Sequence, residues 1–176
     1  MEISNIEIVN IDLFNSKLSD YQEIIDRCQK IIDENLTSNG GTLKQGNIFQ
    51  KDLPFTNLLI ACIDNDIIGF ALLRTSENTH NLKEANNYFY LSDIVVKNGY
   101  KTRGVGTELL EKALECCGEY PLVASVLKEN ELSIKLLSKF MTHYGKSKTG
   151  KYYRFVDNST YYKIYNNMED INAVKR

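Results

Sequence analysis

The stretch D-I-V-V-K-N-G-Y-K-T-R-G-V-G-T-E-L-L, from Asp93 to Leu110, decides how the rest of the chain is interpreted. It begins as a strand, passes through a turn with Gly104 and Gly106, and continues with helical spacing. The first N–H groups of a helix have no partner within it, and the helix dipole makes this end positive. Glycines let an anion approach such a backbone closely. The stretch therefore predicts a phosphate-binding turn, or a turn that needs glycine for backbone geometry alone.

Two common phosphate-binding patterns do not fit this turn. A Walker P-loop requires an upstream glycine before Gly-Lys-Ser/Thr, and the stretch Gly145-Lys146-Ser147 lacks that glycine. A dinucleotide-binding fold requires a third glycine in an early strand–helix–strand unit, whereas this turn lies in the middle of the chain. The turn is therefore neither a Walker P-loop nor the glycine-rich turn of a dinucleotide-binding fold.

Outward from the turn, strand and helix patterns alternate along the chain. We expect strands at 6–13, 58–63, 67–73, 88–96, 121–127, 151–156 and 161–165, and helices at 18–32, 105–117 and 130–140. Asp64-Asn65-Asp66 predicts a hairpin turn, and Asp157-Asn158 predicts the turn of a closing hairpin. The order predicts an α/β (α+β mixed) fold with one mixed sheet, in a single domain over 1–165. Residues 166–176 are expected to form a tail or short helix.

The composition excludes several classes of protein. Of 176 residues, 43% are hydrophobic and 25% charged, which is typical of soluble globular domains. A net charge of −2 disfavours nucleic-acid and anionic-membrane partners. The longest apolar runs, 58–63 and 67–73, fall far short of the roughly 20 residues that cross a membrane. The start M-E-I-S-N-I-E lacks the apolar segment of a secretory signal.

Cysteine and histidine usage indicates a reduced, cytoplasmic protein without a metal site. There are four cysteines without C-x-x-C spacing and only two histidines. The cysteines are Cys28, Cys62, Cys116 and Cys117. We therefore interpret the thiols as packing residues.

The glycine turn resembles a known cofactor loop. Y-K-T-R-G-V-G-T-E-L-L resembles the acetyl-coenzyme A loop of the GNAT N-acetyltransferase superfamily, where Arg or Gln precedes a Gly-x-Gly or Gly-x-Ala by three positions. Lys101 stands at the Arg or Gln position, whereas Gly104 and Gly106 match. Asn98 replaces a proline that is frequent upstream of the loop.

A second motif lies downstream. N-E-L-S-I-K-L-L-S-K-F, residues 130–140, is similar to the family's helix that begins with Asn and carries a Leu-Tyr pair. Asn130, Ser133 and Leu136 match, whereas Leu137 replaces the usual tyrosine. The resemblance covers residues 58–165. It implies a mostly antiparallel sheet of about seven strands, splayed between the fourth and fifth and flanked by about four helices.

The resemblance implies transfer of the acetyl group of acetyl-CoA to a primary amine by direct attack in a ternary complex, without a metal. The loop amides would hold the pyrophosphate, and the strand before them would bind the pantetheine arm. The cofactor-binding residues implied are Ile94, Val95, Val96, Lys101, Thr102, Arg103, Gly104, Val105, Gly106, Thr107, Asn130 and Ser133. Asn130 also suffices as a helix N-cap. The acceptor, a small molecule or a peptide, cannot be read from these motifs.

Three residues are candidates for the chemistry. The Val96 N–H would donate to the thioester carbonyl, and Asp93 is the nearest acid to act as general base. Asp93 as a strand-end carboxylate facing water is an equal alternative, and Glu34 and Glu129 are weaker candidates. Because Leu137 removes the family's tyrosine, Tyr144 or a tyrosine of the closing hairpin is a candidate proton donor for the leaving thiolate. A tyrosine that only packs its ring is the alternative.

Two other functions stay open. The missing helix tyrosine is compatible with a non-catalytic acyl-CoA-binding sensor on the same fold. An interaction domain with a purely structural glycine turn is the third interpretation. The aromatic residues expected in the closing hairpin suit a covered sheet, an acceptor wall or a homodimer contact.

Overall fold

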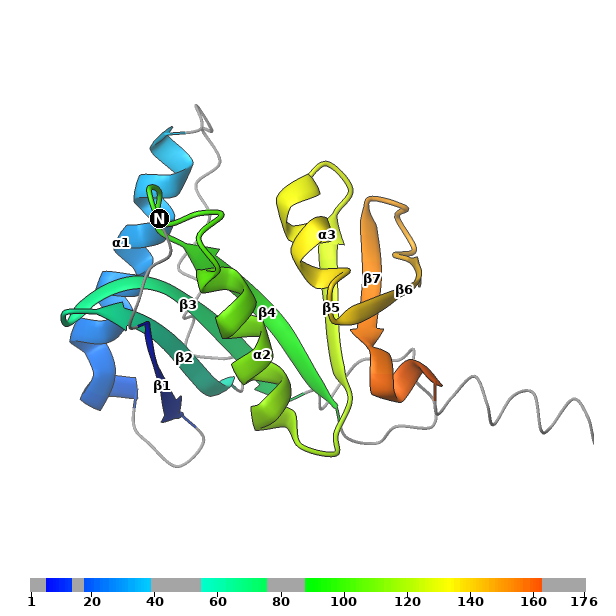
Figure 1. The fold of residues 1–176 in the computed structure, drawn as a ribbon, viewed down its shortest axis with the longest axis horizontal. Coiled ribbons are helices and arrows are strands. Elements are labelled where there is room, and N and C mark those ends of the chain that lie inside the picture. Colours follow the sequence, from blue (N-terminus) through cyan, green and yellow to red (C-terminus); the bar gives the residue numbers. More distant parts are fainter. Residues whose placement is uncertain (1–5, 14–17, 39–54, 76–87, 163–176) are drawn as a thin grey trace, which may run out of the picture.

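A single mixed sheet forms the centre of the molecule (Figure 1). The computed structural model describes residues 6–13, 18–38, 55–75 and 88–162. Within them, seven strands are ordered β1-β2-β3-β4-β5-β7-β6. They are β1 (Glu7–Asp12), β2 (Phe55–Ile63), β3 (Asp66–Thr75), β4 (Phe89–Val96), β5 (Leu122–Leu127), β6 (Met141–Lys146) and β7 (Tyr152–Asp157). All neighbours are antiparallel except β4 and β5, so the predicted mixed, mostly antiparallel sheet is confirmed.

Helices cover both faces of the sheet. A 3-10 turn η1 (Leu18–Tyr21) leads into α1 (Gln22–Ser38), and α2 (Val105–Cys117) and α3 (Glu131–Leu137) follow later in the chain. Apolar residues of α2 pack on one face, in a cluster that includes Leu59, Leu73, Leu109, Leu122 and Phe155. Those of α1 pack on the other, in a cluster that includes Ile25, Cys28, Leu58, Phe70 and Leu72. Strands β2 and β3 are buried on both sides, which explains their nearly continuous apolar sequence. No helix of these described segments is long and apolar enough to cross a bilayer.

The sheet divides between β4 and β5. Only Phe89–Leu91 of β4 pairs with Leu122–Ala124 of β5, although β4 runs to Val96 and β5 to Leu127. Figure 1 shows the two strands diverging beyond this short paired segment. The predicted splay is therefore confirmed, and it leaves the end of β4 without a strand on that side.

The closing hairpin differs from the prediction. Residues 151–156 were expected to pair with 161–165, but β7 pairs with β6, and Ser147 to Gly150 form the turn between them. After β7 the chain is helical at 158–162, and Tyr165 lies outside the described residues, as does the expected tail. The reason is the Asp157 carboxylate. It accepts hydrogen bonds from the Thr160 N–H (2.8 Å) and the Ser159 hydroxyl (2.6 Å), which starts a helical turn where we expected a hairpin turn.

Helix α3 is shorter than the expected 130–140. It ends at Leu137, and Lys139 and Phe140 donate their N–H groups to the carbonyls of Leu136 and Leu137. These bonds span three residues and tighten the last turn, so Phe140 precedes β6 instead of continuing the helix. Leu137 is 3% exposed and belongs to the core.

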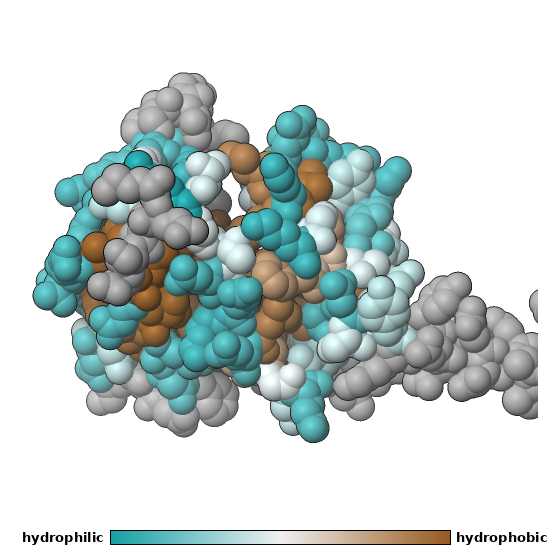
Figure 2. Space-filling view, in the orientation of Figure 1, coloured by the Kyte–Doolittle hydropathy of each residue, from teal (hydrophilic) through white to brown (hydrophobic). Residues whose placement is uncertain are grey.

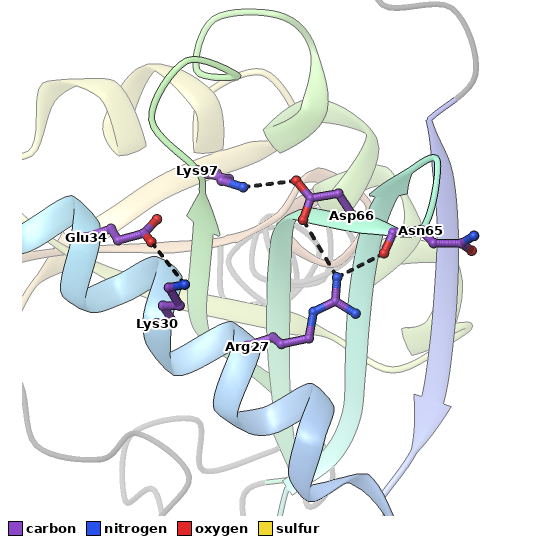
Figure 3. A network of polar contacts seen from close by, with 6 residues as sticks. All are labelled: Arg27, Lys30, Glu34, Asn65, Asp66 and Lys97. Carbon is purple, nitrogen blue, oxygen red and sulfur yellow. Dashed lines mark hydrogen bonds and ion pairs between the residues drawn. The ribbon is translucent and has the colours of Figure 1, made fainter.

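Polar contacts hold α1 against the strand ends (Figure 3). Asp66, the first residue of β3, accepts from Lys97 at 2.9 Å and pairs with Arg27 of α1 at 3.7 Å. The Arg27 guanidinium also donates to the Asn65 carbonyl at 2.9 Å. The hydrogen bond to Asp66 raises the pKa of Lys97. Partly exposed ion pairs contribute little each, so their effect is to fix how α1 lies relative to the end of β4.

We predict that Asp157→Ala lowers the free energy of unfolding by about 1–3 kcal/mol at pH 7, because Asp157 is buried and also accepts the Leu122 N–H at 3.0 Å. Burial alone would raise the pKa of Asp157, but hydrogen bonds from Ser159, Thr160 and Leu122 outweigh it and lower that pKa. The stabilisation is therefore complete above the unfolded pKa of roughly 4 and is lost as pH falls through the lower folded value.

Urea unfolding of the Asp157 variant and of the unchanged protein, from pH 7 down to pH 2, measures this difference. Asp26→Ala, at an exposed position of α1, is the control and should change stability by less than about 0.5 kcal/mol. A difference between the Asp157 variant and the unchanged protein that stays constant with pH would contradict this account.

Candidate functional site

A cavity of about 530 Å³ lies where β4 separates from β5, bounded by the end of β4, the start of α2 and one side of α3. Figure 2 shows a hollow at the upper edge of the molecule, between the half that carries α1 and the half that carries α3. Ten of the twelve residues predicted to bind a cofactor line this cavity. They are Ile94, Val95, Val96, Lys101, Thr102, Gly104, Gly106, Thr107, Asn130 and Ser133.

The free side of β4 presents backbone groups to the cavity. Val96 lies opposite Gly69 of β3, and the next residue, Lys97, donates its N–H to the Ile68 carbonyl at 2.8 Å. Hydrogen-bonded and non-hydrogen-bonded positions alternate along an antiparallel pair. The N–H and C=O groups of Ile94 and Val96 therefore point away from β3, into the gap between β4 and the diverging β5.

Asn35 of α1 fixes the end of this edge, and no motif or periodicity in the sequence indicated it. Its side-chain amide donates to the Val96 carbonyl at 2.9 Å, and its Oδ1 accepts the Asn98 N–H at 3.2 Å. The same residue lines the cavity. Helix α1 thus occupies the Val96 carbonyl and leaves the Val96 N–H directed into the gap.

The glycine turn is shaped as an anion cradle. Gly104 is the N-cap of α2 with φ +93°, no side chain caps this helix, and a Cβ at Gly104 would meet nothing within 4 Å. The carbonyl of Gly104 accepts the N–H groups of Thr107 and Glu108. Helix geometry leaves the N–H groups of Val105 and Gly106 without a partner in the helix. These donors and the positive end of the helix dipole can hold a phosphate.

The other two loop residues predicted to bind a cofactor, Arg103 and Val105, do not line the cavity. The Val105 side chain is fully buried in the core, so only its N–H can serve the cradle. The Arg103 guanidinium lies 6.0 Å from the centre of the Tyr100 ring and does not line the cavity.

Three lysines line the cavity, of which the sequence analysis named only Lys101. Lys139 donates to the Thr107 hydroxyl at 3.0 Å, which joins the residue after α3 to the first turn of α2. Lys135 lies one helical turn before Lys139. The available signal was their spacing of four, which would place two cations on one side of the helix expected at 130–140. These charges suit an anionic ligand.

Helix α3 contributes its amino-terminal end to the cavity. Asn130 caps it by accepting the Ser133 N–H at 3.1 Å through Oδ1, so the predicted N-cap is confirmed. The cap uses only the oxygen of the Asn130 amide. Leu132, which is 63% exposed, and Leu136, which matches the helix motif, add apolar surface, and neither was among the residues predicted to bind a cofactor.

The predicted acid and base lie elsewhere. Asp93 accepts the Ser92 hydroxyl at 2.6 Å, and neither it nor Tyr144 lines the cavity. Ser92 is an extra residue in β4, because Leu72 of β3 lies opposite Asp93 whereas Leu73 lies opposite Leu91. Beyond this bulge Asp93 shares a face of the sheet with Leu72, which is the α1 face.

The two weaker general-base candidates, Glu34 and Glu129, and the cysteine thiols lie outside the cavity. Glu34 pairs with Lys30 along α1 at 3.9 Å, and Glu129 is exposed before α3. The cysteines are free thiols, and burial raises the pKa of Cys28 and of Cys117 to about 12, which suits packing residues. No cluster of three or more metal-ligating side chains occurs in the segments that the structure describes.

Comparison with known proteins identifies the family. The sequence model of the Acetyltransferase (GNAT) family matches residues 21–141, more than half of the chain. The chain belongs to the GNAT acetyltransferase family. It is therefore an acyltransferase by class, and the matched segment contains the cradle, both sides of the sheet division and α3.

Several solved structures share the fold of this chain at low sequence identity. ElaA of Escherichia coli is 13% identical, with 88% of this chain and 100% of ElaA covered and a TM-score of 0.60. PH1933 of Pyrococcus horikoshii OT3 is 19% identical (86% and 98% covered, TM-score 0.61). An acyl-CoA N-acyltransferase of Pseudomonas aeruginosa is 12% identical (87% and 99% covered, TM-score 0.60). At these identities the comparison shows the fold alone.

We predict that the effect of Gly106→Ala depends on Leu136. A Cβ at Gly106 would lie 3.2 Å from Leu136 Cδ2, so Leu136 must shift, whereas alanine in a helix gains up to about 1 kcal/mol over glycine. In a Leu136→Ala background Gly106→Ala should therefore stabilise the protein by more than it does in the natural sequence, by about 0.5 kcal/mol or more. Unfolding of the four proteins by urea measures this coupling. Equal effects in both backgrounds would show that Gly106 is not needed for close packing.

Proposed function

We propose that this GNAT protein transfers the acetyl group of acetyl-CoA to a primary amine. The observation that carries the proposal is the alignment of two features along one cavity: the cradle at Gly104 and the free backbone edge at Ile94 and Val96. The first suits a pyrophosphate and the second suits an amide-bearing arm that lies beside β4 as a strand would.

The residues present fit acetyl-CoA. The open space over Gly104 would admit the pyrophosphate to the N–H groups of Val105 and Gly106. Lys101, Lys135 and Lys139 would add charge-assisted contacts to its phosphates. When bound, acetyl-CoA supplies a thioester as the acetyl donor.

Different groups of the chain would serve the separate steps of acetyl transfer. An amine of ordinary pKa near 10.4 must lose a proton before it can attack, and we assign that proton to Asp93. The amine nitrogen then forms a bond to the acetyl carbon, the carbon–sulfur bond breaks, and the thiolate takes up a proton. The Val96 N–H, directed into the gap, would stabilise the negative charge that develops on the thioester oxygen.

Tyr144 is the proposed donor of the proton to the thiolate. Burial raises the pKa of Tyr144, and the neighbouring Arg154 lowers it in part by its charge and by a hydrogen bond from its side chain. The hydroxyl therefore keeps its proton at neutral pH. Leu137, at the family's tyrosine position, is buried in the core and provides no such group.

We predict that acetyl-CoA at 100 times its Kd adds about 2.7 kcal/mol to the free energy of unfolding. Gly104→Ala should weaken this binding at least tenfold, because a Cβ fills the space where the phosphate approaches. Gly99→Ala is the matched control, because Gly99 also has a positive φ (+88°) and open space but lies outside the cavity.

Both glycine variants should lose about 1–2 kcal/mol of stability from left-handed backbone strain. Calorimetric titration with acetyl-CoA separates strain from binding. Equal affinities in the two variants would remove Gly104 from the cradle, and no binding to the natural protein would overturn the proposed function.

We predict that Asp93→Asn lowers kcat about 100-fold or more in a thiol-release assay, because the amide cannot accept the amine proton. The Kd of acetyl-CoA should not change, since Asp93 does not line the cavity. Raising the pH should restore part of the rate as the free amine becomes abundant. An unchanged kcat would exclude Asp93 as the base. Acetyl-CoA binding without thiol release from any amine would instead favour the sensor alternative.

A further inference from the structure

Charged and phenolic side chains that the cavity does not use gather on the α1 face of the sheet, where β4 and β5 separate. Arg74 of β3 lies directly opposite Tyr90 of β4. Asp93 lies beyond the bulge on the same face, near enough to act on Arg74. Burial lowers the pKa of Arg74, and the charge of the Asp93 carboxylate raises it again in part.

A second arginine approaches the same place from the other side of the division. Arg154 of β7 lies opposite Ser125 of β5 and two residues before the buried Val156. Because side chains alternate along a strand, Arg154 shares the face of Val156. Val156 packs with Tyr88 and Val123, and Tyr90 and Tyr144 pack against that cluster. Register and packing thus place Arg74 and Arg154 on one face.

Tyr90 connects the two arginines. It lies opposite Arg74 and packs against the same cluster as Tyr144, whose hydroxyl is hydrogen-bonded to the Arg154 side chain. All of these side chains are half-buried. The group therefore combines two guanidinium ions with one carboxylate, that of Asp93, beside the point where the β4 edge becomes free.

We propose that this face binds the acceptor, and that the acceptor is an amine that also carries an anionic group, a carboxylate or a phosphate. The anionic group lies near Tyr90 between Arg74 and Arg154, and the amine lies at Asp93. The inference rests on the proposed acetyl transfer, because it assumes that the thioester reaches the bulge at Ser92 from the opposite face.

The charges and donors favour such an acceptor over a neutral or polycationic one. A guanidinium offers five N–H donors in a planar fork, and this geometry matches the oxygens of a carboxylate or a phosphate. Hydrogen bonds between a guanidinium and a carboxylate or phosphate are roughly twice as strong as neutral ones, and partial burial strengthens them. An amine with several positive charges would meet two arginines for one acid, a like-charge cost.

Matched amines test the class of acceptor. With acetyl-CoA saturating, thiol release is measured for each common amino acid and its carboxamide, for O-phosphoethanolamine and ethanolamine, and for spermidine. We expect an anionic amine to exceed its neutral partner at least tenfold in kcat/KM, since a hydrogen bond to a charged group is worth about that factor or more. The amino-acid and phosphate arms distinguish a carboxylate from a phosphate.

Variants test the two arginines with the best anionic amine. Arg74→Gln and Arg154→Gln should each raise its KM about tenfold or more, with the Kd of acetyl-CoA unchanged. Arg154→Lys should recover part of the loss, because it keeps the charge. Lys128→Gln is the control: it removes a half-buried cation that lies 5.4 Å from the Tyr153 ring, and it should leave KM unchanged.

The outcomes separate the two proposals. If acetyl-CoA does not bind the natural protein, the acetyl-transfer proposal fails and the acceptor inference fails with it. If acetyl-CoA binds, but neutral amines or spermidine react as fast as anionic amines, or they react and no anionic amine does, the acceptor inference alone is overturned. It is also overturned if the arginine variants keep the natural KM while the thermal midpoints of unfolding show that they are folded.

Discussion

The loss of pairing between β4 and β5 after three residues is the constraint on which the site depends. Backbone N–H and C=O groups at the end of a strand need hydrogen-bond partners. Here the neighbouring strand β5 diverges and provides none. Asn35 takes the Val96 carbonyl, but nothing in the strand ladder takes the Val96 N–H. The end of β4 is therefore a short unpaired strand edge, to which an extended ligand can bind. β4 and β5 are the parallel neighbours of this sheet, and parallel neighbours are connected by a crossover helix. That helix, α2, brings the glycine turn to the open end of the same edge.

Close packing keeps this opening in shape. Gly106 lets α2 approach Leu136 of α3 and Val96 of β4 at the mouth of the cavity. Lys139 joins the far end of α3 to Thr107, and Asn35 and the Asp66 contacts join α1 to the strand ends. The contacts of Gly106 and Lys139 join α2, which packs on β4, to α3, which follows β5, and so hold the two sides of the gap. The contacts of Asn35 and Asp66 fix the end of β4 on one side of it. A preformed gap saves a ligand the cost of opening one.

The sequence predicted the parts of this arrangement that local patterns encode. The strands predicted up to residue 156, the glycine turn and the Asn130 cap each depend on neighbouring residues, and the structure agrees with them. The strand expected at 161–165 is instead helical up to Tyr162, and β6 was not predicted. The closing hairpin was wrong because Asp157-Asn158 is as good a helix cap as a turn. In the structure the Asp157 carboxylate accepts the Thr160 N–H of the helical turn and also the Leu122 N–H, 35 residues away, a contact that no local pattern shows. Asn35, Lys139 and the two arginines could not be assigned roles, because their positions depend on which strands and helices become neighbours. The register in which two strands pair depends on both strands, whereas hydrophobic periodicity can be recognised within one segment.

The division of the sheet also separates two kinds of recognition. On the α2 face, the cradle consists of helix-end amides and flexible lysines, which suit any phosphate of the right shape and carry little information about the rest of a ligand. On the α1 face, the proposed acceptor contacts come from side chains fixed by strand register on β3, β4 and β7. Planar guanidinium groups in fixed positions discriminate between anions and cations more sharply than mobile ammonium groups do. Relatives that share the cradle can therefore differ in acceptor through changes at a few strand positions, which is why the family assignment defines the reaction class and the arginines, not the glycines, should define the substrate.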